Sequence, residues 1–119
     1  MKGSRKVLSL TDYLDAATPI TNLSSLNAAG LPEPPDNALI PAGSLALVEV
    51  PVDYGQLMRT DAHLAVRWRQ HIRVLLQTLM QRRFIVTDFL REPYAGQPRA
   101  FYLLSQPESV FGGADFSYN

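Results

Sequence analysis

The chain has no cysteine, no long hydrophobic run and no net charge, and each absence removes a class of protein. Without cysteine there can be no disulfide, no thiolate nucleophile and no cysteine-bound zinc, and two histidines, His63 and His71, do not make a metal site by themselves. The longest apolar run, 45–50, contains Glu49 and is far shorter than the roughly 20 residues of a membrane-spanning helix. No apolar stretch follows the basic residues at the start, so we expect no signal peptide, no membrane association and a cytoplasmic location.

The charges balance overall but are unevenly placed. Six of the eleven basic residues lie in or beside the segment 61–84, where the only acid is Asp61. They are Arg59, Arg67, Arg69, Arg73, Arg82 and Arg83. Such a surface suits a carboxylate or phosphate ligand, or else its arginines pair with acids on neighbouring elements. Because the chain as a whole is neutral and no aromatic residues are interleaved on the exposed face, we expect no nucleic-acid partner.

Periodicity predicts the main elements. Apolar residues at steps of three and four predict an amphipathic helix over 61–84, with Asp61 as its N-cap, Trp68 in the core and both histidines on the surface. A shorter helix is expected over 53–59, with Asp53 as N-cap, and another over 11–17, with Thr11 as N-cap. Strands are predicted at 45–50, 84–91 and 100–105, the last two antiparallel.

These elements indicate an α+β fold, in which a β-α-β-β unit packs one long amphipathic helix on a small mixed sheet. The unit, 44–105, follows an N-terminal segment and a Pro/Gly/Asn-rich connector, 1–43, and precedes a tail, 106–119, which is expected to be mobile or to act as a docking arm. One helix covers only one face of three strands. We therefore expect a partner on the other face, either a second copy of the chain or another polypeptide.

Two arginines of the long helix are the first candidate ligand-binding residues. Arg69 and Arg73 are one turn apart, so their guanidinium groups can converge on one carboxylate or phosphate. The alternative is that they form ion pairs with Glu49, Asp53 or Asp88 and fix the helix to the sheet.

The acids and one tyrosine are the remaining candidates. Glu49 shares a face with Leu45 and Leu47, so it lies at a wet end of the sheet or is buried with a partner, and Asp88 is expected on the face of Val86. Either carboxylate could act as a general base, and Tyr102 is the candidate if a hydroxyl acid is needed. No nucleophile–base pair follows from the spacing, so no catalytic residue is assigned.

The order of several polar residues resembles the C-terminal region of predicted acyltransferases of the GNAT superfamily. The similarity covers about 45–104 and follows a pattern VEIPxD, D-x-x-x-A-x-x-WR-x-x-x-R, GYxVxDF and R-x-x-YxL. The matching residues are Val48, Glu49, Pro51, Asp53, Asp61, Ala65, Trp68, Arg69, Arg73, Val86, Asp88, Phe89, Arg99, Tyr102 and Leu104. Arg83 and Phe84 replace the Gly-Tyr pair, so the exit from the helix is expected to differ.

The resemblance implies acyl-CoA-dependent N-acylation of an amine or amino acid. GNAT enzymes hold the CoA pyrophosphate with a Q/R-x-x-G-x-G/A loop that opens a helix, and no such loop occurs in this chain. We therefore expect an accessory or substrate-side module that binds no cofactor alone and acts with a CoA-binding domain. The alternatives are a non-enzymatic, self-associating α/β module and a small-anion-binding dimer.

Overall fold

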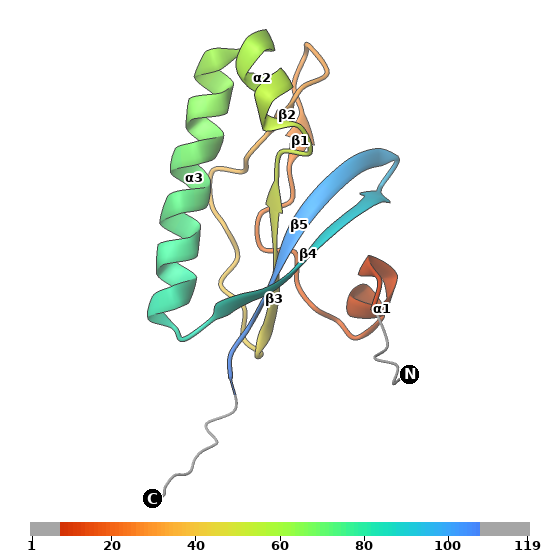
Figure 1. Ribbon diagram of the computed structural model, residues 1–119, viewed down its shortest axis with the longest axis vertical. Coiled ribbons are helices and arrows are strands. Elements are labelled where there is room, and N and C mark those ends of the chain that lie inside the picture. The colour runs from red at the N-terminus through yellow and green to blue at the C-terminus, as the bar shows by residue number, and fades with distance from the viewer. Residues whose placement is uncertain (1–7, 108–119) are drawn as a thin grey trace, which may run out of the picture.

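The computed structural model describes residues 8–107, in which a three-stranded sheet has one long helix on one side and a short helix near its other side (Figure 1). The elements in chain order are α1 (Leu10–Asp15), β1 (Ser25–Leu26), β2 (Pro32–Glu33), β3 (Leu45–Val50), α2 (Tyr54–Thr60), α3 (Ala62–Gln81), β4 (Ile85–Tyr94) and β5 (Gln97–Ser105). The α+β class and the order β-α-β-β predicted from the sequence are confirmed. The stretches of the tail and N-terminus outside 8–107 lie beyond the described residues.

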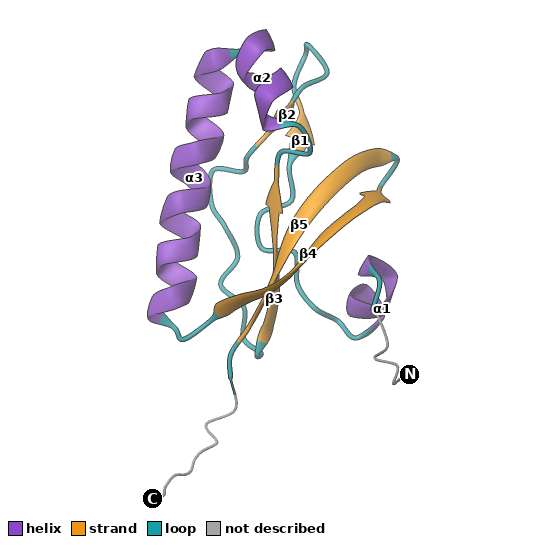
Figure 2. Cartoon of the chain, viewed as in Figure 1, coloured by secondary structure: helices purple, strands orange, loops and turns teal. Residues whose placement is uncertain are grey.

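The sheet has the order β3-β5-β4, with the last strand in the middle. Both ladders are antiparallel, so the sheet is antiparallel and not mixed as expected, and β3 and β4 run in the same direction on either side of β5. Within the described residues the one parallel pairing is a bridge between Ile20 and Leu47, on the outer edge of β3. The connector therefore covers one edge of the sheet, as Figure 2 shows beside β3.

Helix α3 begins and ends as capping chemistry requires. The side chain of Asp61 accepts a hydrogen bond from the Leu64 amide at 3.1 Å, which satisfies one free N–H of the first turn. At the other end Arg83 has φ 73° and Phe84 donates back to the Leu79 carbonyl, a Schellman ending in which glycine is the usual residue. The exit turn thus places an arginine in a left-handed conformation.

The core lies on both faces of the sheet. On one face α3 packs against the strands through Leu75 and Leu79, together with Phe84, and Trp68 is fully buried as expected. On the other face α1 packs against the sheet through Leu10, which contacts the cluster of Phe101. The expectation of a poorly covered second face was wrong, because α1 and Ile20 of the connector pack against the buried residues of this face.

The short helix α1 starts earlier than the sequence predicts. Its N-cap is Ser9, not Thr11, and Ser9 forms a capping box with Asp12. This shift turns Leu10 and Leu14 toward the sheet. The serine was overlooked because the apolar pattern over one or two turns is too short to fix a boundary.

A β-bulge changes the faces of β4. Val86 pairs with Leu104 and Asp88 with Leu103, so Thr87 is one extra residue on β4. The extra residue puts Asp88 on the α1 face, and the prediction that it shares the face of Val86 was therefore wrong.

Candidate functional site

A buried ion pair joins the two neighbouring strands β3 and β5. Glu49 is 4% exposed and Arg99 is 7% exposed, and Nη1 of the arginine lies 3.1 Å from both carboxylate oxygens of the glutamate. The Arg99 Nε also donates to the Tyr94 carbonyl at 2.9 Å, and its guanidinium carbon lies 5.9 Å from the centre of the Tyr94 ring. These contacts fix the plane of the guanidinium group.

The connector completes the coordination of this pair. Ser24 donates its backbone N–H to one oxygen of Glu49 at 2.7 Å and its hydroxyl to the other at 2.9 Å, and its hydroxyl accepts from Arg99. Asn22 bonds to the backbone of Glu49 through both ends of its amide. Burying two charges is costly, and this set of hydrogen bonds offsets the loss of hydration.

Three neighbouring hollows lie at this end of β3, and Val52 lines all of them. A narrow hollow of about 190 Å³ reaches Ser24, Glu49 and Arg99. A wide one of about 700 Å³ lies between the turn of the β4–β5 hairpin and the start of α2. We call the three together the Val52 cleft.

The third hollow of the Val52 cleft is apolar. It has a volume of about 150 Å³, and most of its lining is apolar, with Asp53, Gln56 and Thr60 at its rim. The apolar lining residues are Leu31, Pro32, Pro51, Val52 and Leu57. Polar and apolar subsites in one concave surface are typical of small-molecule sites.

The guanidinium group keeps one free donor for a ligand. Within residues 8–107, Nη2 of Arg99 forms no hydrogen bond. This nitrogen is accessible to solvent, whereas the unpaired hydroxyl of Thr18 is fully buried. Arg91 also lines the wide hollow and forms no hydrogen bond or ion pair with the described residues. A carboxylate or carbonyl oxygen entering the cleft can therefore accept hydrogen bonds from a guanidinium whose orientation is already fixed.

The acids at the rim have assigned structural partners. Asp53 is the N-cap of α2, as predicted, and accepts from the Gln56 amide at 3.0 Å. Glu92 accepts from the backbone N–H of Leu10 at 2.9 Å. Of the candidates named from the sequence, Glu49 and Asp53 thus meet at this cleft.

The other candidates lie elsewhere. Arg69 stacks over the Tyr54 ring at 5.5 Å, and Arg73 is exposed on the next turn of α3. Tyr102 is half-buried under α3, with its ring 5.6 Å from that of Phe89. The structure does not bring these side chains into the cleft.

Asp88 is exposed on β4, where its carboxylate accepts from the Phe89 amide. Among the described residues neither Arg69 nor Arg73 forms an ion pair with Glu49, Asp53 or Asp88. The proposed pairing of the helix arginines with these acids was therefore wrong, because the side chain of Glu49 lies on the sheet face opposite α3 and pairs with Arg99.

Sequence reasoning missed the partners of Glu49. Arg99 belongs to the acyltransferase-like pattern but was not weighed as a partner, and Ser24 and Asn22 lie in the connector. The available signal was Glu49 itself, because a glutamate inside a buried strand requires a donor on an adjacent strand. Strand order could have pointed to Arg99, but the sequence does not determine that order.

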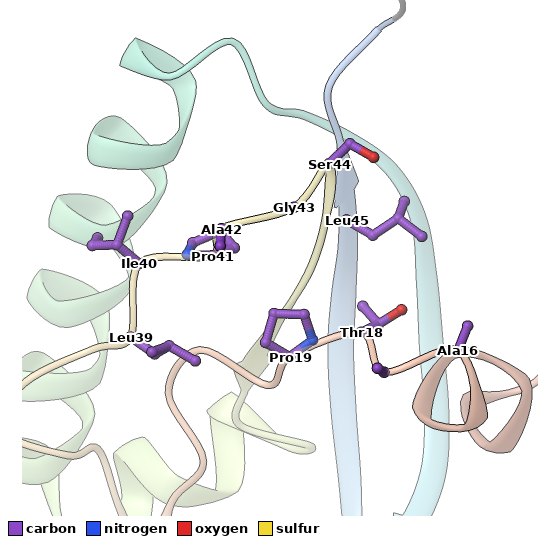
Figure 3. A pocket seen from close by; sticks show the side chains of 11 residues that line it. Ala16, Thr18, Pro19, Leu39, Ile40, Pro41, Ala42, Gly43, Ser44 and Leu45 are labelled. Carbon is purple, nitrogen blue, oxygen red and sulfur yellow. The ribbon is translucent and has the colours of Figure 1, made fainter.

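A separate hollow of about 460 Å³ lies at the opposite end of β3 (Figure 3). It is lined by residues 16–19 and 39–45, which include no charged side chain. The buried hydroxyl of Thr18 belongs to this wall. The hollow therefore offers apolar surface but no group for acid–base chemistry.

Within residues 8–107 no group of histidine, aspartate and glutamate side chains is placed to hold a metal ion, and no helix is long and apolar enough to cross a membrane. Comparison of the chain with protein-family models, with curated proteins and with solved structures found no match.

Proposed function

We propose that this chain is a substrate-side binding module that holds a small carboxylate-bearing molecule in the Val52 cleft. The observation that carries the proposal is Nη2 of Arg99, which forms no hydrogen bond with the described residues although Nε and Nη1 of the same guanidinium group are held by Tyr94, Ser24 and Glu49. Burial removes most of the competing water, so a hydrogen bond from this nitrogen to an anionic oxygen is stronger than on the surface. The arginine is held in place before the ligand arrives, which reduces the entropic cost of binding.

The hollows favour a ligand with a polar head and an apolar arm. A carboxylate at Arg99 leaves the arm directed toward the neighbouring hollow of Leu31 and Leu57, because Val52 lies at the junction of both. A volume of about 150 Å³ suits an aliphatic side chain and is too small for a nucleotide. The proposed ligand class is therefore an aliphatic amino acid or a close derivative.

The reaction class comes from the acyltransferase-like pattern. An amino acid carries both a carboxylate for Arg99 and an amine that can accept an acyl group, so such a ligand agrees with a role as acceptor-binding part of an acyl-CoA-dependent N-acyltransferase. The CoA-binding loop would be supplied by a partner domain, and the proposed place of action is the cytoplasm. No described residue is assigned to the chemical step.

The test is an NMR titration of the ¹⁵N-labelled chain with leucine and with N-acetyl-leucine. Gln56→Trp places a bulky ring at the rim of two hollows without touching the ion pair, and Gln70→Trp makes the same change on the exposed face of α3. We expect amide shifts around Val52 and Arg99, affinity reduced about tenfold or more in Gln56→Trp, and no change in Gln70→Trp. Binding that survives Gln56→Trp unchanged, or no binding to the wild type, would overturn the proposal.

A further inference from the structure

The amide of Asn22 has a defined orientation, because Glu49 holds both of its ends. Oδ1 accepts from the Glu49 N–H at 2.6 Å, and Nδ2 donates to the Glu49 carbonyl at 2.9 Å. Exchanging the two ends would place donor against donor and acceptor against acceptor. Nδ2 must therefore be the atom that faces α3.

The atom of α3 that Asn22 faces is a ring nitrogen of His71. Nε2 of the histidine lies 3.1 Å from Nδ2 of Asn22. Since Nδ2 can only donate, Nε2 must accept, and the imidazole is neutral with its proton on Nδ1. The expectation that His71 is a plain surface residue was wrong, because it is half-buried between the connector and the edge of the Trp68 ring.

We propose that His71 is a proton-sensitive latch, which holds the connector at Asn22 while it is neutral and releases it when it is protonated. Protonation puts a second N–H on the ring, and this N–H points at a group that has no free acceptor. The contact between α3 and the connector then becomes a donor–donor repulsion.

The latch acts on the Val52 cleft through Glu49. Asn22 binds the backbone of Glu49, and Ser24, two residues further along the connector, binds its carboxylate. The same carboxylate orients Arg99. Release of Asn22 therefore disturbs the guanidinium group that the proposed ligand requires. This effect on ligand binding rests on the proposed function, whereas the contact between His71 and Asn22 is independent of it.

The surroundings of His71 favour its neutral form. Burial lowers the pKa of His71 below its usual value. The charged groups near it are Asp36 of the connector, which lines the same hollow of about 240 Å³, and Arg67 one turn earlier on α3, whose guanidinium lies 4.0 Å from Glu33. Glu49 contacts the latch through its backbone alone, because its carboxylate is turned to Arg99.

The direction of the pH effect follows from this depressed pKa. The unfolded chain takes up a proton near pH 6.5, whereas the folded chain resists protonation. The stabilisation by neutral His71 is therefore complete above about pH 6.5, and it is lost as the pH falls through the lower pKa of the folded state.

The test uses His71→Gln, whose side-chain oxygen can still accept from Asn22 but does not titrate, and His63→Gln, the same change at an exposed position of α3. NMR of the full chain follows the His71 ring and the amides of Ser24 and Glu49 between roughly pH 5 and pH 8. We expect the Nδ1–H tautomer and amide shifts that follow the titration of His71. The denaturant midpoint should decrease as the pH is lowered in the wild type and in His63→Gln, but not in His71→Gln. The same pH dependence in His71→Gln, or a His71 titration that leaves these amides unmoved, would overturn the latch.

A second variant should shift the pKa of His71 in the opposite direction. Asn22→Asp places a carboxylate opposite Nε2, which favours the imidazolium form, so the pKa of His71 should rise instead of fall. An unchanged pKa in this variant would contradict the contact. Leucine binding should weaken on acidification in the wild type but not in His71→Gln. If leucine fails to bind at every pH while the amides and the stability behave as expected, the proposed function is overturned and the latch is supported.

Discussion

Arg99 on β5 reaches across to Glu49 on β3, and its Nη1 lies 3.1 Å from both carboxylate oxygens. The pair ties the two strands to the connector through Ser24. It also explains why a charged residue occurs near the end of the apolar strand β3.

Breaking this pair should be costly. Glu49→Gln leaves a buried guanidinium without its counter-charge, and we expect a loss of about 3–5 kcal/mol in the free energy of unfolding, measured with urea. Arg67→Ala removes the exposed contact to Glu33 and should cost less than about 1 kcal/mol. The double change Glu49→Leu with Arg99→Met should cost less than Glu49→Gln alone; a larger loss would show that the charges are not coupled.

The arginine at the end of α3 offers a stabilising substitution. Arg83 has φ 73°, a conformation that costs a side-chain-bearing residue about 1 kcal/mol and glycine almost nothing. We expect Arg83→Gly to raise the free energy of unfolding by about 0.5–1 kcal/mol. Arg82→Gly, one residue earlier at φ −96°, should lower stability instead. If Arg83→Gly destabilises the protein as Arg82→Gly does, the left-handed conformation at residue 83 is not a source of strain.

Tyr13 reports the docking of α1 on the sheet. Burial, followed by the negative charges of Asp88 and Asp12, raises the pKa of Tyr13 above 10. The resulting stabilisation is complete below about pH 10 and is lost as the pH rises through the higher folded value. In an absorbance titration, Asp88→Asn should lower the pKa of Tyr13, with Tyr13→Phe used to assign the signal. If Tyr13 titrates at the same pH in the wild type and in Asp88→Asn, α1 does not hold Tyr13 near Asp88.

Trp68 connects the core to the apolar part of the cleft. Its ring is fully buried, and its Nε1 donates to the carbonyl of Pro32 at 2.9 Å. Trp68→Phe keeps the aromatic packing but leaves this carbonyl without its donor. We expect a loss of about 1–3 kcal/mol and reduced leucine binding, because Pro32 lines the apolar hollow. If the variant folds and binds leucine as tightly as the wild type, Trp68 does not support the cleft.

The regular elements could be predicted because their causes are local. Asp61 and Asp53 cap their helices as the sequence suggests, and the apolar stripe of α3 contains Trp68. The bulge at Thr87 could not be predicted, since nothing in a β-branched run indicates which residue will be left unpaired.

The candidate site was only half predictable for the same reason. Glu49 was recognised as a residue that needs a partner, but the partner depends on the order β3-β5-β4, which local patterns do not determine. Asn22 and Ser24 were overlooked because a proline-rich stretch gives no periodic signal, although its side chains form specific hydrogen bonds. The arginines of α3 are the most numerous basic residues of any described element, yet the arginines that line the Val52 cleft are Arg91 and Arg99, on strands β4 and β5.

The most direct measurement is a crystal structure of the chain grown with N-acetyl-leucine. We expect the carboxylate within about 3 Å of Nη2 of Arg99 and the aliphatic arm beside Leu57. A ligand bound instead at Arg69 and Arg73, with the Val52 cleft empty, would contradict the proposed binding site.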